Sequence, residues 1–215
     1  MKTVYLSEKA DPRLKRYIRE CGYDIFNVKA TSFVSGPVSS HADIYYCKLG
    51  CNDGAPVFCD KKEKLGYFYP SDIIYNAACT GKFFIHDLRH TDRTLMEKAK
   101  DMEMIFIDVK QGYSKCSICV VDENSVITAD QGIAKKISKE KGPDCLLISP
   151  GHIILERHEY GFIGGSCGLI GNEIVFNGDI SLHPDFKRIS NYIKSRGLSL
   201  KWFPGREPED IGSLL

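Results

Sequence analysis

Two stretches of the chain, GYSKCSICVVDENSVITADQGIAKKIS at residues 112–138 and GFIGGSCGLIGNEIVFNGDISLHPDFKRIS at residues 161–190, follow one plan. Each opens on a glycine and an aromatic residue, then places small residues and a cysteine around an apolar run. A polar turn containing Asn124 or Asn172 separates this run from a second one, which is a hairpin signal. An aspartate and a basic amphipathic segment follow. The two stretches therefore predict a strand–strand–helix unit that recurs along the chain.

Weaker copies of this unit precede the two clear ones. Residues 72–100 read as two strands joined by a Thr-Gly turn and followed by a helix, with Thr91 or Asp92 as its cap. Residues 41–60 read as a degraded copy whose helix is shortened. Residues 3–28 read as a half-copy, in which a helix that opens with proline lies between two strands.

Such a unit cannot bury its own apolar faces, whereas stacked or closed copies can. The half-copy at residues 3–28 suggests a ring that closes by pairing the ends of the chain, because closure removes exposed sheet edges. We therefore predict an α/β fold in a single domain over residues 1–215, with residues 204–215 as a surface tail. The alternative is an ordinary α/β sandwich whose segments resemble one another by chance.

The composition narrows the classes of function. Apolar residues make up 43% and charged residues 27%, so the chain can build a full core. The 29 basic and 28 acidic side chains leave a net charge of +1, which disfavours general nucleic-acid or membrane-surface binding. No apolar run has the length of a signal peptide or a membrane span. We expect a cytoplasmic protein whose nine cysteines are reduced thiols.

Two short motifs accompany the repeats. His41-Ala42-Asp43, followed by the apolar run Ile44-Tyr45-Tyr46, resembles the His-x-Asp motif of arginine and agmatine deiminases. Ile163-Gly164-Gly165-Ser166-Cys167-Gly168 resembles their Gly-Gly-x-x-Cys loop, with one residue fewer. With the ring of repeats, these motifs resemble the pentein, or guanidino-group-modifying-enzyme, fold, and the chain looks closest to an uncharacterised family with that fold. The resemblance implies a β/α propeller of ββαβ units around a pseudo-symmetry axis.

The resemblance also implies roles for particular residues. Cys167 would be the nucleophile that attacks the guanidinium carbon, His41 the acid/base and Asp43 a ligand of the guanidinium group. Gly164 and Gly165 would let backbone amides approach the tetrahedral intermediate, and so belong to the substrate-binding set. The alternative is that Cys167 is a small buried side chain and that His41 caps a strand.

Other polar residues have two interpretations each. His152 follows a Pro-Gly turn and is a second candidate for the acid/base. Asp130 and Asp179 end the second strands of the two clear units, where they would either cap the next element or bind a cationic substrate. Cys116 and Cys119 form a Cys-x-x-Cys pair in a strand-like segment, which favours core packing. No spacing matches a known metal site, so no metal is expected.

Two main functions remain open on the sequence, and a ligand sensor that keeps the pocket without the chemistry is a third. The first is a cysteine-dependent hydrolase or amidinotransferase that acts on a guanidine or amidine C–N bond through a covalent thiouronium intermediate. It would need no metal or organic cofactor and would take a guanidine-bearing small molecule. The second is a non-catalytic pentein module that binds a protein, ribosomal or small-molecule partner. The two motifs favour the first function, and the absence of the acidic segment that holds guanidinium in the deiminases favours the second.

Overall fold

Short strands and six helices build the mixed α/β fold of residues 2–215, the part of the chain that the computed structural model describes. The helices are α1 (Pro12–Glu20), α2 (Ala42–Tyr45), α3 (Arg93–Asp101), α4 (Ser114–Ser117), α5 (Gln131–Lys139) and α6 (Phe186–Ser195). The strands are β1 (Lys2–Ser7), β2 (Tyr23–Val28), β3 (Cys47–Lys48), β4 (Val57–Phe58), β5 (Ala78–Cys79), β6 (Phe83–His86), β7 (Ile105–Asp108), β8 (Ile118–Asp122), β9 (Ser125–Thr128), β10 (Asp144–Leu147), β11 (Cys167–Ile170), β12 (Glu173–Phe176) and β13 (Ser199–Lys201). The prediction of an α/β protein is confirmed.

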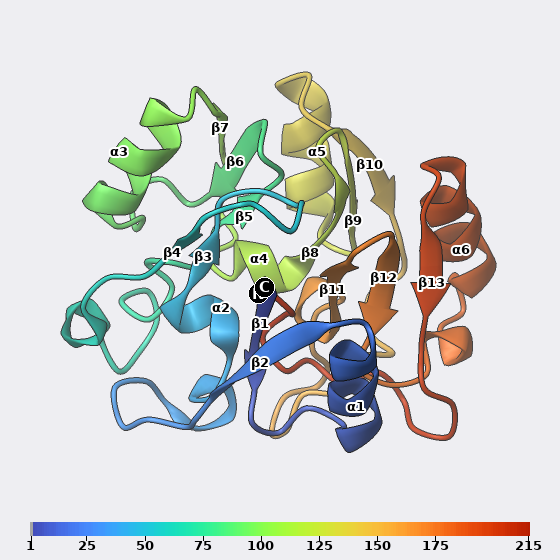
Figure 1. Ribbon diagram of the computed structural model, residues 1–215. Helices are drawn as coiled ribbons and strands as arrows, with labels where there is room; N and C mark the ends of the chain where they lie inside the picture. The colour runs from blue at the N-terminus through green and yellow to red at the C-terminus, as the bar shows by residue number, and fades with distance from the viewer. Residues whose placement is uncertain (1) are drawn as a thin grey trace.

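Three of the small sheets follow the same order along the chain. In each, two antiparallel strands form a hairpin, a helix follows, and the next strand returns parallel to the second one. These sets are β5–β6–α3–β7, β8–β9–α5–β10 and β11–β12–α6–β13. A two-stranded pair, β3–β4, and the parallel pair β1–β2 complete the five sheets within residues 2–215, and no β-ladder joins them into a barrel. Figure 1 shows the sheets arranged around a common centre.

Strand β1 and the last residues of the chain meet at that centre (Figure 1). Tyr5 in β1 and Leu215 exchange both backbone hydrogen bonds, at 3.0 and 3.1 Å. Such an exchange is the pattern of an antiparallel pair. The last residues therefore lie against β1 as a short antiparallel partner, while β2 pairs with β1 in parallel on the same sheet.

Aspartates begin three of the longer helices, as their positions in the sequence predict. Asp11 accepts a hydrogen bond from the backbone N–H of Arg13 at the start of α1, and a proline occupies the next position. Asp92, rather than Thr91, caps α3 through the N–H of Leu95. Asp130 caps α5 in the same manner through a backbone N–H three residues on. These bonds satisfy N–H groups that a helix start leaves free.

Two segments differ from their predicted strands. Residues 72–77 form turns, and only Ala78–Cys79 of that apolar run is a strand. Residues 42–45 form one turn of helix, α2, with His41 at its N-cap position. Both segments are almost entirely buried. A short apolar run that is buried on all sides carries no period, so its pattern does not distinguish a strand from a helical turn.

The predicted surface tail is wrong for most of its length. Residues 204–207 form an exposed turn, but from Pro208 onwards the chain enters the interior. Ile211, Leu214 and Leu215 are 2 to 4% exposed and pack in the core. These three apolar side chains lie within five residues, and removing their surface from water is favourable. The segment therefore packs at the centre instead of lying on the surface.

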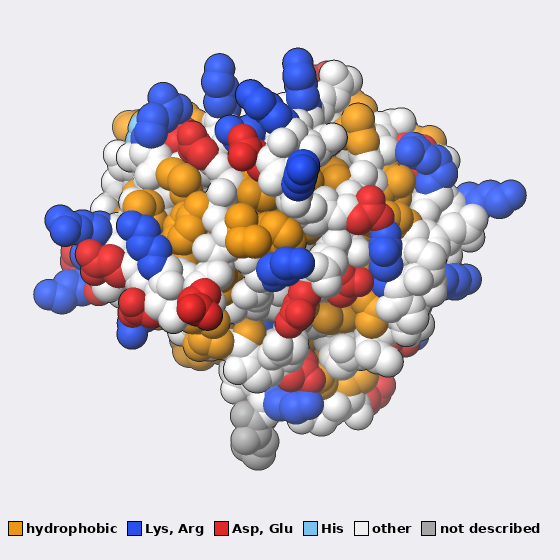
Figure 2. Space-filling view, turned by 90° about the horizontal axis from the view of Figure 1, so that it is seen from above, with side chains coloured by type: hydrophobic (Ala, Val, Ile, Leu, Met, Phe, Trp, Pro, Cys, Tyr) orange, Lys and Arg blue, Asp and Glu red, His pale blue; other side chains and the backbone are white. Residues whose placement is uncertain are grey.

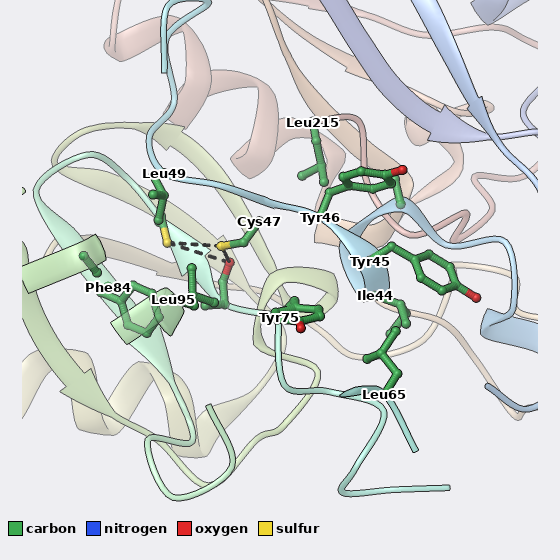
Figure 3. Packing of buried hydrophobic residues seen from close by; sticks show 14 of the residues in the cluster. Ile44, Tyr45, Tyr46, Cys47, Leu49, Leu65, Tyr75, Phe84, Leu95 and Leu215 are labelled. Atoms are coloured by element: carbon green, nitrogen blue, oxygen red, sulfur yellow. Dashed lines mark hydrogen bonds between the residues drawn. The ribbon is translucent and has the colours of Figure 1, made fainter. Parts of the chain in front are cut away.

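The core consists of four apolar clusters, of which Figure 3 shows one. There the aromatic rings of Tyr45, Tyr46 and Tyr75 lie with Leu215, so the end of the chain belongs to this cluster. In the same cluster the Cys47 thiol lies 3.7 Å from the Cys79 sulfur, and both are free thiols. All nine cysteines are unpaired.

The surface mixes charges of both signs. Figure 2 shows basic and acidic side chains interspersed, with apolar side chains between them, on the face seen from above. Within residues 2–215, no helix combines the length and the apolar character that a membrane span requires.

Candidate functional site

Five segments of the chain meet at the centre of the molecule. Four of them come just before the first strand of a hairpin, and the fifth is the end of the chain. Ser213 connects three of them. Its backbone N–H donates to the Gly165 carbonyl at 2.9 Å, and its hydroxyl lies 2.6 Å from Asp43 Oδ2 and 2.9 Å from the Gly164 carbonyl. The Asp43 N–H in turn donates to the Gly212 carbonyl at 3.1 Å.

Asn76 links the two remaining segments, its own and the one that contains Lys115, to the same centre. Its side-chain amide donates to the Asp43 carbonyl at 3.1 Å, and its oxygen accepts from the N–H of Lys115 at 2.9 Å. Polar groups taken out of water need such partners, because an unsatisfied group costs about 1–3 kcal/mol. The centre is therefore a polar network inside an apolar core.

Within this network lie four side chains that we call the central cluster: His41, Asp43, Cys116 and Asp210. They are 0 to 3% exposed. Ligand atoms of the first three all lie within 4.8 Å of one another, and Asp210 Oδ1 lies 3.7 Å from His41 Nδ1. Cys116 comes from α4, whereas Asp210 comes from the segment expected to be a surface tail. The sequence prediction of core packing for Cys116 missed its polar neighbours, and it missed Asp210 altogether.

The electrostatic environment of the centre favours the protonated forms of Cys116 and Asp210. Burial, and next the negative charge of Asp43, raise the pKa of the Cys116 thiol well above its usual range. The thiol donates a hydrogen bond to Asp43 Oδ2 at 3.0 Å. Burial also raises the pKa of Asp210, against the opposing effect of His41. A nucleophilic cysteine requires the reverse, a pKa lowered by positive charge.

Cys167 lies outside the central cluster. Its side chain is 1% exposed and packs in an apolar cluster with Ile174 and Phe176. The thiol donates to the carbonyl of Ile163 at 3.2 Å, and burial, followed by the hydrogen bond with Cys119, raises its pKa well above the usual range. The structure thus groups His41 with a different cysteine from the one that the motif indicated.

Gly164 and Gly165 are required by close packing. A Cβ atom on Gly165 would lie 1.9 Å from Asp210 Oδ1, and one on Gly164 would lie 2.3 Å from the carbonyl oxygen of Ile118. Gly212 has φ +75° and would place a Cβ 2.1 Å from that of His41. The small residues of the motif therefore allow the central segments to approach one another.

The other predicted site residues lie away from the centre. Asp179 accepts from the backbone N–H of Ser181 and begins a short 3-10 helix, as the capping interpretation predicts. His152 is exposed, with φ 63°, and its ring packs edge-on against His183 at 5.4 Å. Asp130 caps α5 and also accepts from the Gln111 amide at 3.3 Å.

A cavity of about 380 Å³, here called the side cavity, lies beside the central segments. It is bounded by the ends of β9 and β10 and by residues 149–163. Its polar lining includes Gln111, Ser117, Asp130, His158, Glu159 and His183, and its apolar lining includes Ile148, Ile153, Phe162 and Ile163. The lining has two carboxylates and contains no lysine or arginine.

Two residues in the wall of the side cavity carry polar atoms without a partner. Ser117 is 2% and His183 3% exposed, and neither Ser117 Oγ nor His183 Nε2 has a hydrogen-bond partner among the described residues. His183 Nδ1 accepts from the backbone N–H of Asp185 at 3.0 Å, so the proton of the neutral ring is on Nε2. Burial, and next the nearby His152, lower the pKa of His183 and keep the ring neutral.

The fold, the central cluster and the side cavity together define an α/β protein with a buried polar centre and a ligand-sized cavity beside it. The chain belongs to DUF6873, a family of unknown function, whose model matches residues 54–215. The match includes Cys116, Asp130 and Asp210 and begins after His41 and Asp43. No curated protein matches the chain significantly, and no solved structure does.

The thiols offer a direct check on this description. We expect a thiol reagent such as iodoacetamide to modify the exposed Cys21 and Cys59 at least about a hundredfold faster than Cys116 or Cys167, which react only after local or global unfolding. Peptide mass spectrometry at several times would give the rate for each cysteine. Fast modification of Cys116 or Cys167, slowed by arginine or agmatine, would instead identify that cysteine as a reactive nucleophile.

Proposed function

We propose that the chain is a pentein-type ring that binds a small molecule with a guanidinium or ammonium group in the side cavity, without breaking a C–N bond. The repeated hairpin–helix–strand sets support the pentein interpretation. So do the pairing of Tyr5 with Leu215 and the meeting of five segments at one centre. Each is an expected consequence of closing repeated units into a ring.

The observation that carries the binding proposal is the charge of the cavity lining. A volume of about 380 Å³ falls among those of small-molecule sites. Asp130 and Glu159 contribute negative charge, and no lysine or arginine side chain in the lining opposes it. A carboxylate binds the N–H groups of a guanidinium in pairs, while the isoleucines of the wall suit an aliphatic chain.

The unpartnered atoms of the wall agree with a bound molecule. His183 presents a donor and Ser117 a hydroxyl that lack partners within the protein. Because both residues line the cavity, a ligand or water there can supply the missing hydrogen bonds. An amino-acid-like ligand has both the cation for Asp130 and an acceptor for His183.

The buried thiols favour binding over catalysis. Attack on a guanidinium carbon needs a thiolate that the substrate can reach. Cys116 and Cys167 are both almost fully buried, and burial raises the pKa of each. Neither belongs to the lining of the side cavity.

A cysteine-dependent enzyme that acts on a guanidine or amidine is the second candidate. One observation favours it: the thiol of Cys116, the imidazole of His41 and the carboxylate of Asp43 lie together, which are the groups that such chemistry uses. Cys116 would then take the role that the sequence motif gives to Cys167, and the substrate would have to open the centre. The thiol-labelling experiment described above distinguishes this candidate from simple binding.

The binding proposal predicts the effect of one charge. Asp130→Asn keeps a side chain that caps α5 as well as aspartate does, but removes the negative charge. We expect this change to weaken the binding of agmatine, arginine or a methylated arginine by about tenfold, the loss of one charge-assisted hydrogen bond. Isothermal titration calorimetry on the folded variants would measure it.

Asp179→Asn is the matched control for this titration. Asp179 begins the equivalent element of the next unit but does not line the side cavity. We expect it to leave ligand affinity unchanged. Equal losses of ligand affinity in both variants, or no loss of affinity in Asp130→Asn, would contradict the proposal that Asp130 contacts the ligand.

A further inference from the structure

Two buried polar atoms of the central cluster lack hydrogen-bond partners. Asp43 Oδ1 and His41 Nδ1 have no hydrogen-bond partner among residues 2–215, although both side chains are at most 2% exposed. An uncompensated buried carboxylate oxygen or imidazole nitrogen is costly, since water is no longer available to it. A cation between these groups would satisfy both.

The size of the space restricts which cation can enter. The ligand atoms of His41, Asp43 and Cys116 lie within 4.8 Å of one another, and the backbone of Gly165 and Gly212 lies close against Asp210 and His41. Neighbouring ligands of a tetrahedral zinc ion, bound at about 2.0–2.3 Å, lie roughly 3.3–3.8 Å apart. A single ion fits such a group of atoms, whereas a planar guanidinium group needs a cavity of its own.

The chemistry of the donor atoms also points to a metal. A thiolate, an imidazole and carboxylates form the ligand set of zinc, and thiolate disfavours magnesium and calcium, which prefer oxygen. Asp210 Oδ1, 3.7 Å from His41 Nδ1, brings a second carboxylate to the group.

Charge balance supports a divalent ion. The thiolate of Cys116 and the carboxylates of Asp43 and Asp210 would carry three negative charges. Lys115 reaches the same network, because its ammonium group donates to Ser213 Oγ at 3.1 Å, and this hydroxyl lies against Asp43. The charge of Lys115 together with a divalent ion would neutralise the buried anions, as a low-dielectric interior requires.

We propose that the central cluster binds one zinc ion through His41, Asp43, Cys116 and Asp210. The ion replaces the thiol proton of Cys116, which leaves to solvent when the metal binds. It joins α2, α4 and the last segment of the chain, which are far apart in sequence, so its binding adds directly to folding stability. The site is enclosed and has no open position, so the ion has a structural role.

The test uses the full chain, refolded with zinc and separated from free metal by gel filtration. We expect about one equivalent of zinc per chain by inductively coupled plasma mass spectrometry. With cobalt(II) in place of zinc, we expect a thiolate-to-cobalt charge-transfer band and the visible bands of tetrahedral cobalt. Because this spectrum is recorded on the unmodified protein, it tests the site even if a variant fails to fold.

Two variants assign the site. Cys116→Ser is expected to abolish the charge-transfer band and to lower the zinc content at least about tenfold. Cys167→Ser, which changes an equally buried cysteine outside the cluster, is expected to keep both. A folded wild-type protein without the charge-transfer band, or a band that survives Cys116→Ser, would overturn the proposal.

Discussion

Deletion of residues 211–215 is expected to leave the chain unfolded. Ile211, Leu214 and Leu215 are nearly fully buried, and burying one such side chain contributes about 1.5–3 kcal/mol. The deletion also removes Ser213 from the central network and breaks the pairing of Leu215 with Tyr5. The combined loss is comparable with the whole stability of a typical domain, about 5–15 kcal/mol.

Circular dichroism and a urea unfolding curve would measure this effect. Glu207→Ser is the control, because Glu207 lies in the exposed turn that precedes the buried segment. A surface change of this kind is expected to alter stability by at most about 0.5 kcal/mol. If the shortened chain still unfolds cooperatively at a similar urea concentration, the buried segment is not an integral part of the fold.

Gly164→Ala is expected to destabilise the protein by about 3 kcal/mol or more. The new methyl group would lie 2.3 Å from the carbonyl oxygen of Ile118 and 2.4 Å from that of Lys115. Both are backbone atoms of a neighbouring central segment, so neither can move aside as the end of a flexible side chain could. The segments that meet at the centre would have to separate.

Gly36→Ala provides the comparison for this substitution. A methyl group there would meet only the end of the Arg157 side chain, at 4.0 Å, and we expect little change in stability. Differential scanning calorimetry of both variants would give the two effects. Equal melting temperatures for Gly164→Ala and the wild type would show that Gly164 is not required by packing.

The parts of the fold that the sequence predicts well are those with a local signal. The hairpins around Asn124 and Asn172 alternate apolar runs with a polar turn, and both form as predicted. The helices after Asp92 and Asp130 begin at their capping aspartates. In each case the hydrogen bonds and the apolar pattern involve residues that are close in sequence, so a short window contains the whole signal.

The centre could not be predicted because its signal is not local. His41, Cys116 and Asp210 lie far apart in sequence, and their spacing matches no metal or catalytic motif. Only the packing of α2 and α4 against the last residues brings them together. The same packing turns the predicted tail into core, since Pro and Gly near residue 204 indicate a turn but not where the chain goes after it.

The side cavity likewise depends on tertiary contacts. Asp130 was a predicted binding residue, whereas His183 was not; its Nδ1 accepts a hydrogen bond from the backbone N–H of Asp185. The ring belongs to the wall of a cavity that forms from several segments far apart in the sequence. A sequence gives no indication of such a wall before the segments are placed.

Nuclear magnetic resonance of the His183 ring tests the central claim most directly, that a small cation binds in the side cavity and is not transformed. Long-range ¹H–¹⁵N spectra would be recorded during titration with agmatine, arginine and methylated arginines, and the same samples would report any conversion of the ligand. The account predicts a saturable shift of His183 Nε2 with at least one of these ligands, an unchanged ligand, and a weaker response in Asp130→Asn. Unshifted His183 signals with all of them, or conversion of a ligand that is lost in Cys116→Ser or Cys167→Ser, would contradict it.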